Sequence, residues 1–198
     1  MCPGFFFRTQ NMATSVSICS NALLMLGAQT INDLNEGTDR ARLAANLYPQ
    51  VRDEMLRSHP WNCAIKRVVL APDVAMPPFG YTYQFTLPSD WIRTLSVGDY
   101  GEEIDFRSEG QRILADTDTL KLRYVFHNTN EATWDAGFVE SMQLAMAARM
   151  AYAITQSTSL EDLRVREMEM ALKRARAADG QDDPPETLGD FRLLSSRY

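Results

Sequence analysis

Two groups of residues carry side chains that could do nucleophilic or acid–base chemistry. His59 lies four residues before Cys63, and such a pair could supply a general base and a thiol nucleophile. Glu102, Glu103 and Asp105 could supply the paired carboxylates of a glycosidase-type mechanism. Each group also has a simpler interpretation. His59 stands before a proline at an expected helix end, where a histidine caps the last carbonyls or faces solvent, and the acidic residues fall in an exposed turn. We therefore expect no catalytic residue at either place.

Metal and cofactor motifs are missing from the sequence. It contains no glycine-rich phosphate loop, no Gly-x-Ser-x-Gly elbow and no His-Glu-x-x-His motif. The two histidines, His59 and His127, lack zinc-ligand spacing to Cys2, Cys19 and Cys63. Three cysteines without close pairing also argue against a disulfide framework. We predict no metal and no cofactor.

The composition argues against several classes of function. Of the 198 residues 45% are hydrophobic and 23% charged, as in a soluble protein of one domain or of one domain with an insertion. A net charge of −6 argues against a chain that coats nucleic acid or anionic lipid. Most basic residues are arginines, which protein interfaces favour, and this hints at assembly. The cysteines indicate a reducing intracellular compartment.

Two helices are expected before residue 60. The first is capped by Thr14 or Ser15 and ends at Gly27. The second opens at Thr38 and should stop at His59, because Pro60 disfavours helical geometry there. Pro49 lies inside this second helix and should kink or divide it. Its apolar stripe recurs every four residues: Leu43, Leu47, Val51 and Met55.

Short strands are expected in the middle of the chain. Alternating apolar and polar residues separated by proline and glycine turns predict five or six antiparallel strands, in a small sheet or an open barrel. The expected strands are residues 64–70, 81–87, 91–97, 103–107, 111–114 and 119–127.

Two further helices are expected after the strands. Asp135 caps the third, which is apolar nearly all round from 138 to 154 and should be buried. A membrane span is the competing interpretation, but the run is short and contains charged residues. The fourth helix reaches about Ala178. It carries two four-residue ion pairs in the favourable order, Asp162 with Arg166 and Glu169 with Lys173.

The fold class that follows is α+β. We expect a four-helix body of antiparallel helices, an inserted small antiparallel β module and an extended C-terminal tail. The expected segments are a disordered stretch or extension (1–13), the first half of the helical body (14–62), the β module (63–130), the second half of the body (131–179) and the docking tail (180–198).

Two sets of residues are candidate interaction sites. The stretch His59, Pro60 and Trp61 marks the junction of the body and the β module, and a buried Trp61 would fix their relative orientation. The tail places apolar residues and arginines after a polar linker, which suggests docking onto a partner, with a frayed tail as the competing interpretation. The docking candidates are Leu188, Phe191, Arg192, Leu193, Leu194, Arg197 and Tyr198.

The order of these elements, with particular residues, resembles the tail tubular protein A family of short-tailed bacteriophages and related head-to-tail adaptor proteins. The resemblance covers roughly residues 14 to 180. It rests on Leu26-Gly27, Leu47-Tyr48-Pro49-Gln50-Val51-Arg52-Asp53-Glu54-Met55-Leu56, His59-Pro60-Trp61-Asn62-Cys63-Ala64, Tyr83-Gln84-Phe85-Thr86-Leu87-Pro88-Ser89-Asp90 and the paired helices from Phe138 to Ala178.

The resemblance implies a structural protein of the virion rather than an enzyme. Family members form a dodecameric ring below the portal, and their C-terminal segment reaches the portal. Their β module faces the distal tail, or nozzle, and double-stranded DNA passes through the channel without sequence-specific binding. Assembly in the host cytoplasm and no membrane contact are expected. A peptidoglycan-degrading virion enzyme and a small helical binding module are the alternatives.

Overall fold

The computed structural model describes residues 12–99 and 104–182 and divides the chain into two compact units. Unit 1 comprises the chain up to Val51 together with Thr129–Lys173. Unit 2 comprises Arg52–Asn128 together with the residues from Arg174 onward. Two of the three boundaries between the units, 51/52 and 173/174, therefore fall inside helices, and the third lies at 128/129. The expected segments meet instead at 62/63, 130/131 and 179/180.

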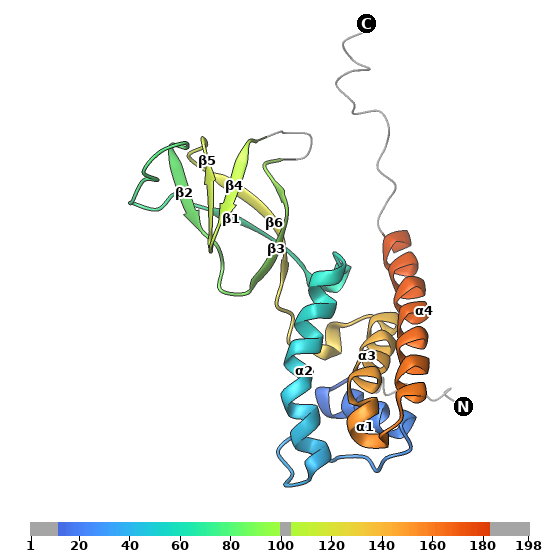
Figure 1. Cartoon of the computed structure of the whole chain (residues 1–198). Coiled ribbons are helices and arrows are strands. Elements are labelled where there is room, and N and C mark those ends of the chain that lie inside the picture. Colours follow the sequence, from blue (N-terminus) through green and yellow to red (C-terminus); the bar gives the residue numbers. More distant parts are fainter. Residues whose placement is uncertain (1–11, 100–103, 183–198) are drawn as a thin grey trace, which may run out of the picture. The chain divides into compact units, whose positions relative to one another are not determined.

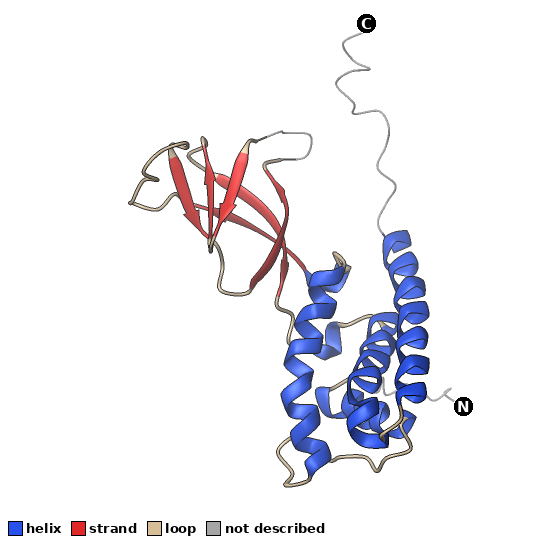
Figure 2. Ribbon diagram, in the orientation of Figure 1, coloured by secondary structure: helices blue, strands red, loops and turns tan. Residues whose placement is uncertain are grey.

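The fold is α+β, and the described residues form four helices and two small antiparallel sheets (Figures 1 and 2). All six strands lie between the second and third helices in the chain, so the β module is an insertion. The helices are α1 (Ser15–Met25), α2 (Asp39–Ser58), α3 (Ala136–Thr155) and α4 (Thr158–Asp182), with 3-10 turns at Asn62–Ala64 and Glu131–Thr133.

Helix α1 begins and ends where the sequence predicts. Thr14 and Ser17 form a capping box, in which each side chain accepts a hydrogen bond from the other residue's backbone N–H. Gly27 adopts a positive φ of 73° just beyond the helix end, a conformation that glycine tolerates without strain. Helix α1 packs against α3 in unit 1.

Helix α3 is the central apolar element of unit 1. Its buried side chains include Phe138, Met142, Met146 and Met150, all fully shielded from solvent. Asp135 caps its first turn by accepting a hydrogen bond from the N–H of Gly137 at 2.8 Å. The expectation of a helix buried on most sides is confirmed.

Helix α2 is continuous from Asp39 to Ser58. Of the two effects predicted for Pro49, a kink or a division of the helix, the division does not occur. Pro49 faces solvent while Tyr48 and Val51 are buried, and the burial of that opposite face offsets the missing N–H hydrogen bond.

The last two positions of the stripe predicted for α2, Val51 and Met55, are buried. Nearer the start of the helix the buried positions are shifted: Ala41 and Ala44 are fully buried, whereas Leu43 and Leu47 are only half-buried. Small alanine side chains let neighbouring backbone approach closely, which a pattern of large apolar residues does not reveal.

The β module contains two three-stranded antiparallel sheets rather than one sheet or an open barrel. One has the order β1-β6-β3 and the other β2-β5-β4. Side chains of both sheets meet in one apolar cluster, which includes Phe85 of β2, Ile113 of β5 and Leu122 of β6. The strands are β1 (Ile65–Leu70), β2 (Tyr83–Thr86), β3 (Trp91–Val97), β4 (Phe106–Glu109), β5 (Arg112–Ala115) and β6 (Leu120–Phe126).

Helix α4 is longer than predicted. It continues through Gly180 to Asp182, whereas the sequence suggests an end near Ala178 and a tail from 180. A glycine in a last turn costs only about 1 kcal/mol relative to alanine, and contacts at Asp179 hold this turn. The remainder of the predicted tail lies outside the described residues.

Within residues 12–99 and 104–182, none of the helices has the length and apolar character needed to cross a membrane.

Candidate functional site: the junction of two helix ends

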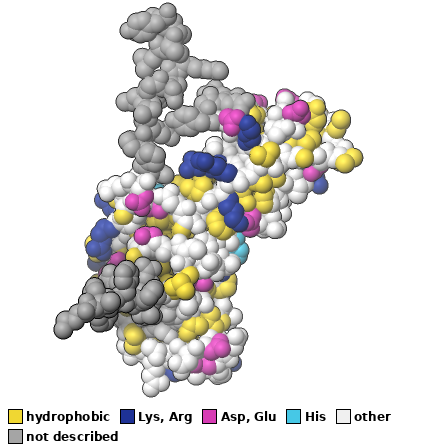
Figure 3. Space-filling model, turned by 180° about the vertical axis from the view of Figure 1, so that it is seen from behind, with side chains coloured by type: hydrophobic (Ala, Val, Ile, Leu, Met, Phe, Trp, Pro, Cys, Tyr) yellow, Lys and Arg dark blue, Asp and Glu magenta, His cyan; other side chains and the backbone are white. Residues whose placement is uncertain are grey.

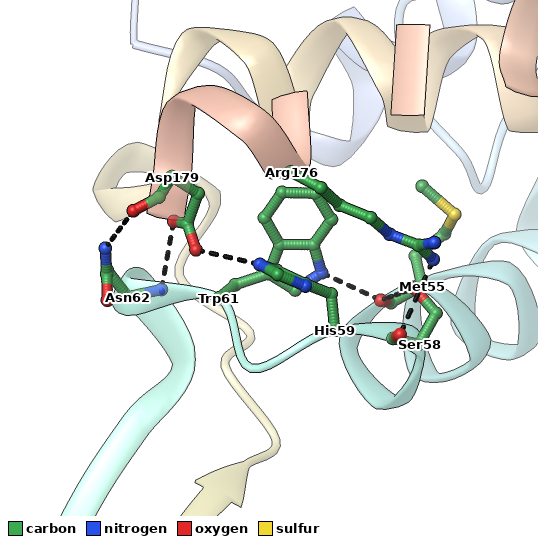
Figure 4. A network of polar contacts seen from close by, with 7 residues as sticks. All are labelled: Met55, Ser58, His59, Trp61, Asn62, Arg176 and Asp179. Atoms are coloured by element: carbon green, nitrogen blue, oxygen red, sulfur yellow. Dashed lines mark hydrogen bonds and ion pairs between the residues drawn. The ribbon is translucent and has the colours of Figure 1, made fainter. Parts of the chain in front are cut away.

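The C-terminal ends of α2 and α4 meet in unit 2 beside the chain that leads into β1 (Figure 4). We call the residues that join them the junction cluster. It contains two of the three predicted junction residues, His59 and Trp61, and five others. The full set is Met55, Ser58, His59, Trp61, Asn62, Arg176 and Asp179.

Trp61 is the apolar centre of the junction cluster. Pro60 follows the last turn of α2, and the chain then turns so that the Trp61 side chain is only 1% exposed. The indole Nε1–H donates a hydrogen bond of 2.9 Å to the carbonyl of Met55, and the ring of His59 lies edge-on at 4.7 Å. The indole ring is therefore buried in an apolar environment, and its N–H has a hydrogen-bond acceptor.

The last carbonyls of α2 are capped by side chains of the junction cluster. A helix leaves its last four carbonyls without intrahelical partners, here those of residues 55–58. The carbonyl of Met55 accepts from Trp61 Nε1 and from Ser58 Oγ, and the carbonyl of Ser58 accepts from Arg176 Nη2 at 3.5 Å. A guanidinium at this point also suits the negative end of the helix dipole.

Asp179 makes the corresponding contacts from α4. Its carboxylate accepts a hydrogen bond from the backbone N–H of Asn62 at 3.1 Å, and its second oxygen lies 3.2 Å from His59 Nε2. The Asn62 amide donates at 2.8 Å to the carbonyl of Asp179, one of the last four carbonyls of α4. The Asp179 side chain is only 10% exposed, so these contacts replace the water that it would otherwise bind.

Further contacts tie the end of α2 to the β module. Arg57 Nη1 donates to the carbonyl of Ile92 at 2.7 Å. His127, just after β6, lies 2.7 Å from a carboxylate oxygen of Asp53 and 2.5 Å from Arg52 Nη2. Together with the junction cluster, these contacts fix the β module on two helix ends.

A second polar network lies at the base of the sheet β1-β6-β3. Asp90 accepts from Lys66 Nζ at 2.6 Å and from Tyr124 OH at 3.0 Å. Partial burial alone would raise the pKa of Asp90, but the hydrogen bonds from Lys66 and Tyr124 outweigh it and lower that pKa. Burial and the adjacent Asp90 raise the pKa of Tyr124 to about 12, so it remains a hydrogen-bond donor.

The contacts of the junction cluster and of the Asp90 network are typical of side chains that position chain segments rather than of catalytic groups. His59 faces a carboxylate that also holds a backbone N–H, as expected of a structural contact. Asp105 accepts from Tyr81 OH at 3.1 Å, and Glu102 and Glu103 lie outside the described residues. Burial, reinforced by the negative charge of Glu131, raises the pKa of Cys19 to about 12, which leaves it a poor nucleophile.

Over the described part of the chain, no group of three or more His, Cys, Asp and Glu side chains is placed to hold a metal ion. The predicted docking residues of the tail, 188–198, fall outside the described residues.

Sequence reasoning did not single out Asp179 or Arg176, and it gave Asn62 no role. A signal for Asp179 would have required the true end of α4, which lies beyond the end predicted near Ala178. A carboxylate in the last turn of a helix opposes the helix dipole, so it needs a partner there. The partner could not be found from spacing, because Asn62 and Asp179 are 117 residues apart.

The chain matches no protein-family model and no curated protein sequence.

Proposed function

We propose that this chain is a structural head-to-tail adaptor of a short-tailed bacteriophage. In this function, copies form a ring, a dodecamer by analogy with the family it resembles, between the portal and the distal tail or nozzle protein. The ring completes the head after DNA packaging and extends the channel through which the DNA leaves.

The observation that carries this proposal is the role of the stretch His59-Pro60-Trp61-Asn62. It belongs to the residues on which the family resemblance rests, and three of its four side chains take part in the junction cluster. A motif used to hold an inserted β module on helix ends suits a protein that must present separate surfaces to different neighbours. The α+β architecture, with strands inserted between helices, agrees with the same family.

The charge of the chain suits a conduit for DNA. Each copy carries a net charge of −6, and a ring multiplies that charge. Acidic side chains on the channel wall would repel phosphates and keep the DNA from adhering during ejection. Mapping Asp and Glu in an assembled ring tests this part, and a basic channel wall would contradict it.

The tail is proposed to dock on the portal. Removing residues 183–198, the part beyond α4, should prevent the chain from binding portal protein. A matched control of full length, with Leu188, Phe191 and Leu193 changed to serine, separates the loss of the apolar side chains from the loss of the segment. Unchanged portal binding by the truncated chain would remove the docking proposal.

Electron microscopy of the purified chain mixed with the portal protein of the same virion tests the function as a whole. Rings that cap the portal are expected. A stable monomer that never binds portal would contradict the proposal. A fall in turbidity when the chain is added to isolated peptidoglycan would favour the wall-hydrolase alternative.

A further inference from the structure

An apolar loop of unit 2 is exposed between β1 and β2. We call residues 74–79 the apolar loop; the segment carries no charged residue. Three of its side chains are largely or fully exposed: Val74 (104%), Phe79 (87%) and Met76 (72%). Three large apolar side chains exposed within six residues are uncommon on a protein that stays alone in water, and they indicate a contact surface.

Specific hydrogen bonds hold both ends of the apolar loop. On one side the N–H of Asp73 donates to the carbonyl of Gln84 at 2.8 Å, and the carboxylate of Asp73 accepts from Thr86 Oγ1 at 2.9 Å. On the other side the N–H of Thr82 donates to the carboxylate of Asp116 at 2.7 Å. Hydrogen bonds thus fix both ends of the loop, and its apolar side chains face solvent.

The base of the apolar loop is acidic. Asp73, Asp116 and Asp105 all make contacts at the loop or its flanking residues. Arg112 is the cation that approaches them, with its Nε 3.7 Å from Asp73. Three carboxylates against one guanidinium leave a negative rim, which favours a partner surface with cationic groups around an apolar centre.

A surface with cations along one side of an apolar pair is present on unit 1 of the same chain. Leu163 and Met170 of α4 are 47% and 58% exposed, and their seven-residue spacing places them on one face of the helix. Arg166 and Lys173 each follow one of them by three residues and flank the same face. We call these four residues the α4 stripe.

The two cations of the α4 stripe are available for a partner. The ion pairs predicted from the sequence, Asp162 with Arg166 and Glu169 with Lys173, do not form among the described residues. The ion pair that this part of α4 does contain joins Arg164 and Glu167 at 2.6 Å, on the other side of the apolar pair. Figure 3 shows that hydrophobic side chains reach the surface among charged ones on the face drawn there.

We infer that the apolar loop of one copy docks on the α4 stripe of the next copy. This inference rests on the proposed ring function and names the two surfaces that form the ring. The surfaces differ, so the contact is heterologous and repeats from copy to copy until the ring closes. An anionic membrane is a poorer partner for the loop, because the acidic rim would be repelled by its headgroups.

Two variants, each lacking one surface, test the contact. The loop variant is Val74→Ser with Met76→Ser and Phe79→Ser, and the stripe variant is Leu163→Ser with Met170→Ser. All five positions are exposed, so circular dichroism should show unchanged folding. Mass photometry and sedimentation velocity, with and without portal protein, give the number of copies in each assembly.

We expect the wild-type chain to form rings and each variant alone to remain monomeric in solution, with an apparent dissociation constant raised by about 100-fold or more. An equal mixture of the two variants should give one-to-one dimers and nothing larger, because only one intact loop and one intact stripe can meet. Tyr152→Ser, at an exposed apolar position outside both surfaces, should assemble as the wild type does.

Reversal of both stripe cations, Arg166→Glu with Lys173→Glu, should weaken assembly roughly ten-fold at low salt.

Each other outcome contradicts a different statement. A wild-type chain that assembles neither alone nor on portal would overturn the proposed function, and the inference with it. Rings from either variant, or no dimers in the mixture, would overturn only the inference. A third result would overturn the inference in favour of a membrane. In that case the wild-type chain binds vesicles of equimolar phosphatidylcholine and phosphatidylglycerol, and the loop variant loses this binding but still assembles normally.

Discussion

Different kinds of contact stabilise the interior of unit 1 and the interior of unit 2. In unit 1, α3 buries a long apolar surface of methionines, alanines and Phe138 against its neighbours. In unit 2, a small apolar cluster of the two sheets is joined to the helix ends by hydrogen bonds centred on Asp179 and Trp61. The core of unit 1 consists of apolar contacts and does not depend on any one hydrogen bond, whereas the junction depends on a few specific donors and acceptors. The junction is thus where single polar substitutions should have local effects.

The largest effect is expected at Trp61, which serves both kinds of contact. Trp61→Ala should lower the free energy of unfolding by about 3–5 kcal/mol, because it removes a fully buried indole and its hydrogen bond to Met55. Urea titration followed by circular dichroism measures the change. Trp61→Phe keeps most of the apolar volume and should lose only about 1 kcal/mol. A loss near zero for the alanine variant would show that Trp61 does not anchor the junction.

A comparable truncation in unit 1 tests a contact that is apolar only. Met146→Ala in α3 should cost about 2–5 kcal/mol, because the side chain is fully buried and its removal leaves a cavity. The cost should be the same at low and high salt, since no charge is involved. The matched control is Met170→Ala at an exposed position of α4, which should cost under about 0.5 kcal/mol. Equal losses from the two substitutions would contradict the assigned core of unit 1.

Removal of the Asp179 carboxylate should loosen the junction and spare unit 1. Asp179→Ala leaves the N–H of Asn62 without its acceptor and should cost about 1–3 kcal/mol. Hydrogen exchange should speed up at residues 59–64 and 176–182 and remain unchanged in α1 and α3. Asp182→Ala, an exposed aspartate on the same helix, is the control and should change neither region. Faster exchange throughout α3 would mean that the two units do not respond separately.

The smallest effect is expected from titration of Asp90 in unit 2. Its pKa in the folded chain is lowered from the ordinary 3.8, so Asp90 stabilises the fold at pH values above about 3.8. That contribution is lost as the pH falls through the lowered pKa, because the protonated acid no longer attracts Lys66. Asp90→Asn should be less stable at neutral pH and should show a shallower loss of stability below pH 4 in acid titrations followed by circular dichroism. Parallel acid profiles for the two chains would contradict this assignment.

The fold could be predicted further from the sequence than the junction could. Local signals were enough for the ends of α1, for the stop of α2 before Pro60 and for β3, since capping residues, proline and alternation act within a few residues. Whether Pro49 kinks or divides α2 could not be decided from the sequence, because burial of the opposite face determines the outcome.

The contacts of the junction depend on pairing across the whole chain. The burial of Trp61 was predictable from its size and its place after Pro60. Its acceptor, the carbonyl of Met55, and the bonds between Asn62 and Asp179 follow only from the folded arrangement. Long-range polar pairs leave no periodic pattern in a sequence, which is why the junction cluster was only partly foreseen.

Native mass spectrometry of the chain mixed with the portal protein of the same virion decides whether the chain is a portal-binding adaptor. We expect a portal assembly whose mass increases by a whole number of 22.4 kDa chains, twelve if the family analogy holds. A spectrum containing only free 22.4 kDa chains and unaltered portal, at concentrations where portal itself is assembled, would contradict this expectation.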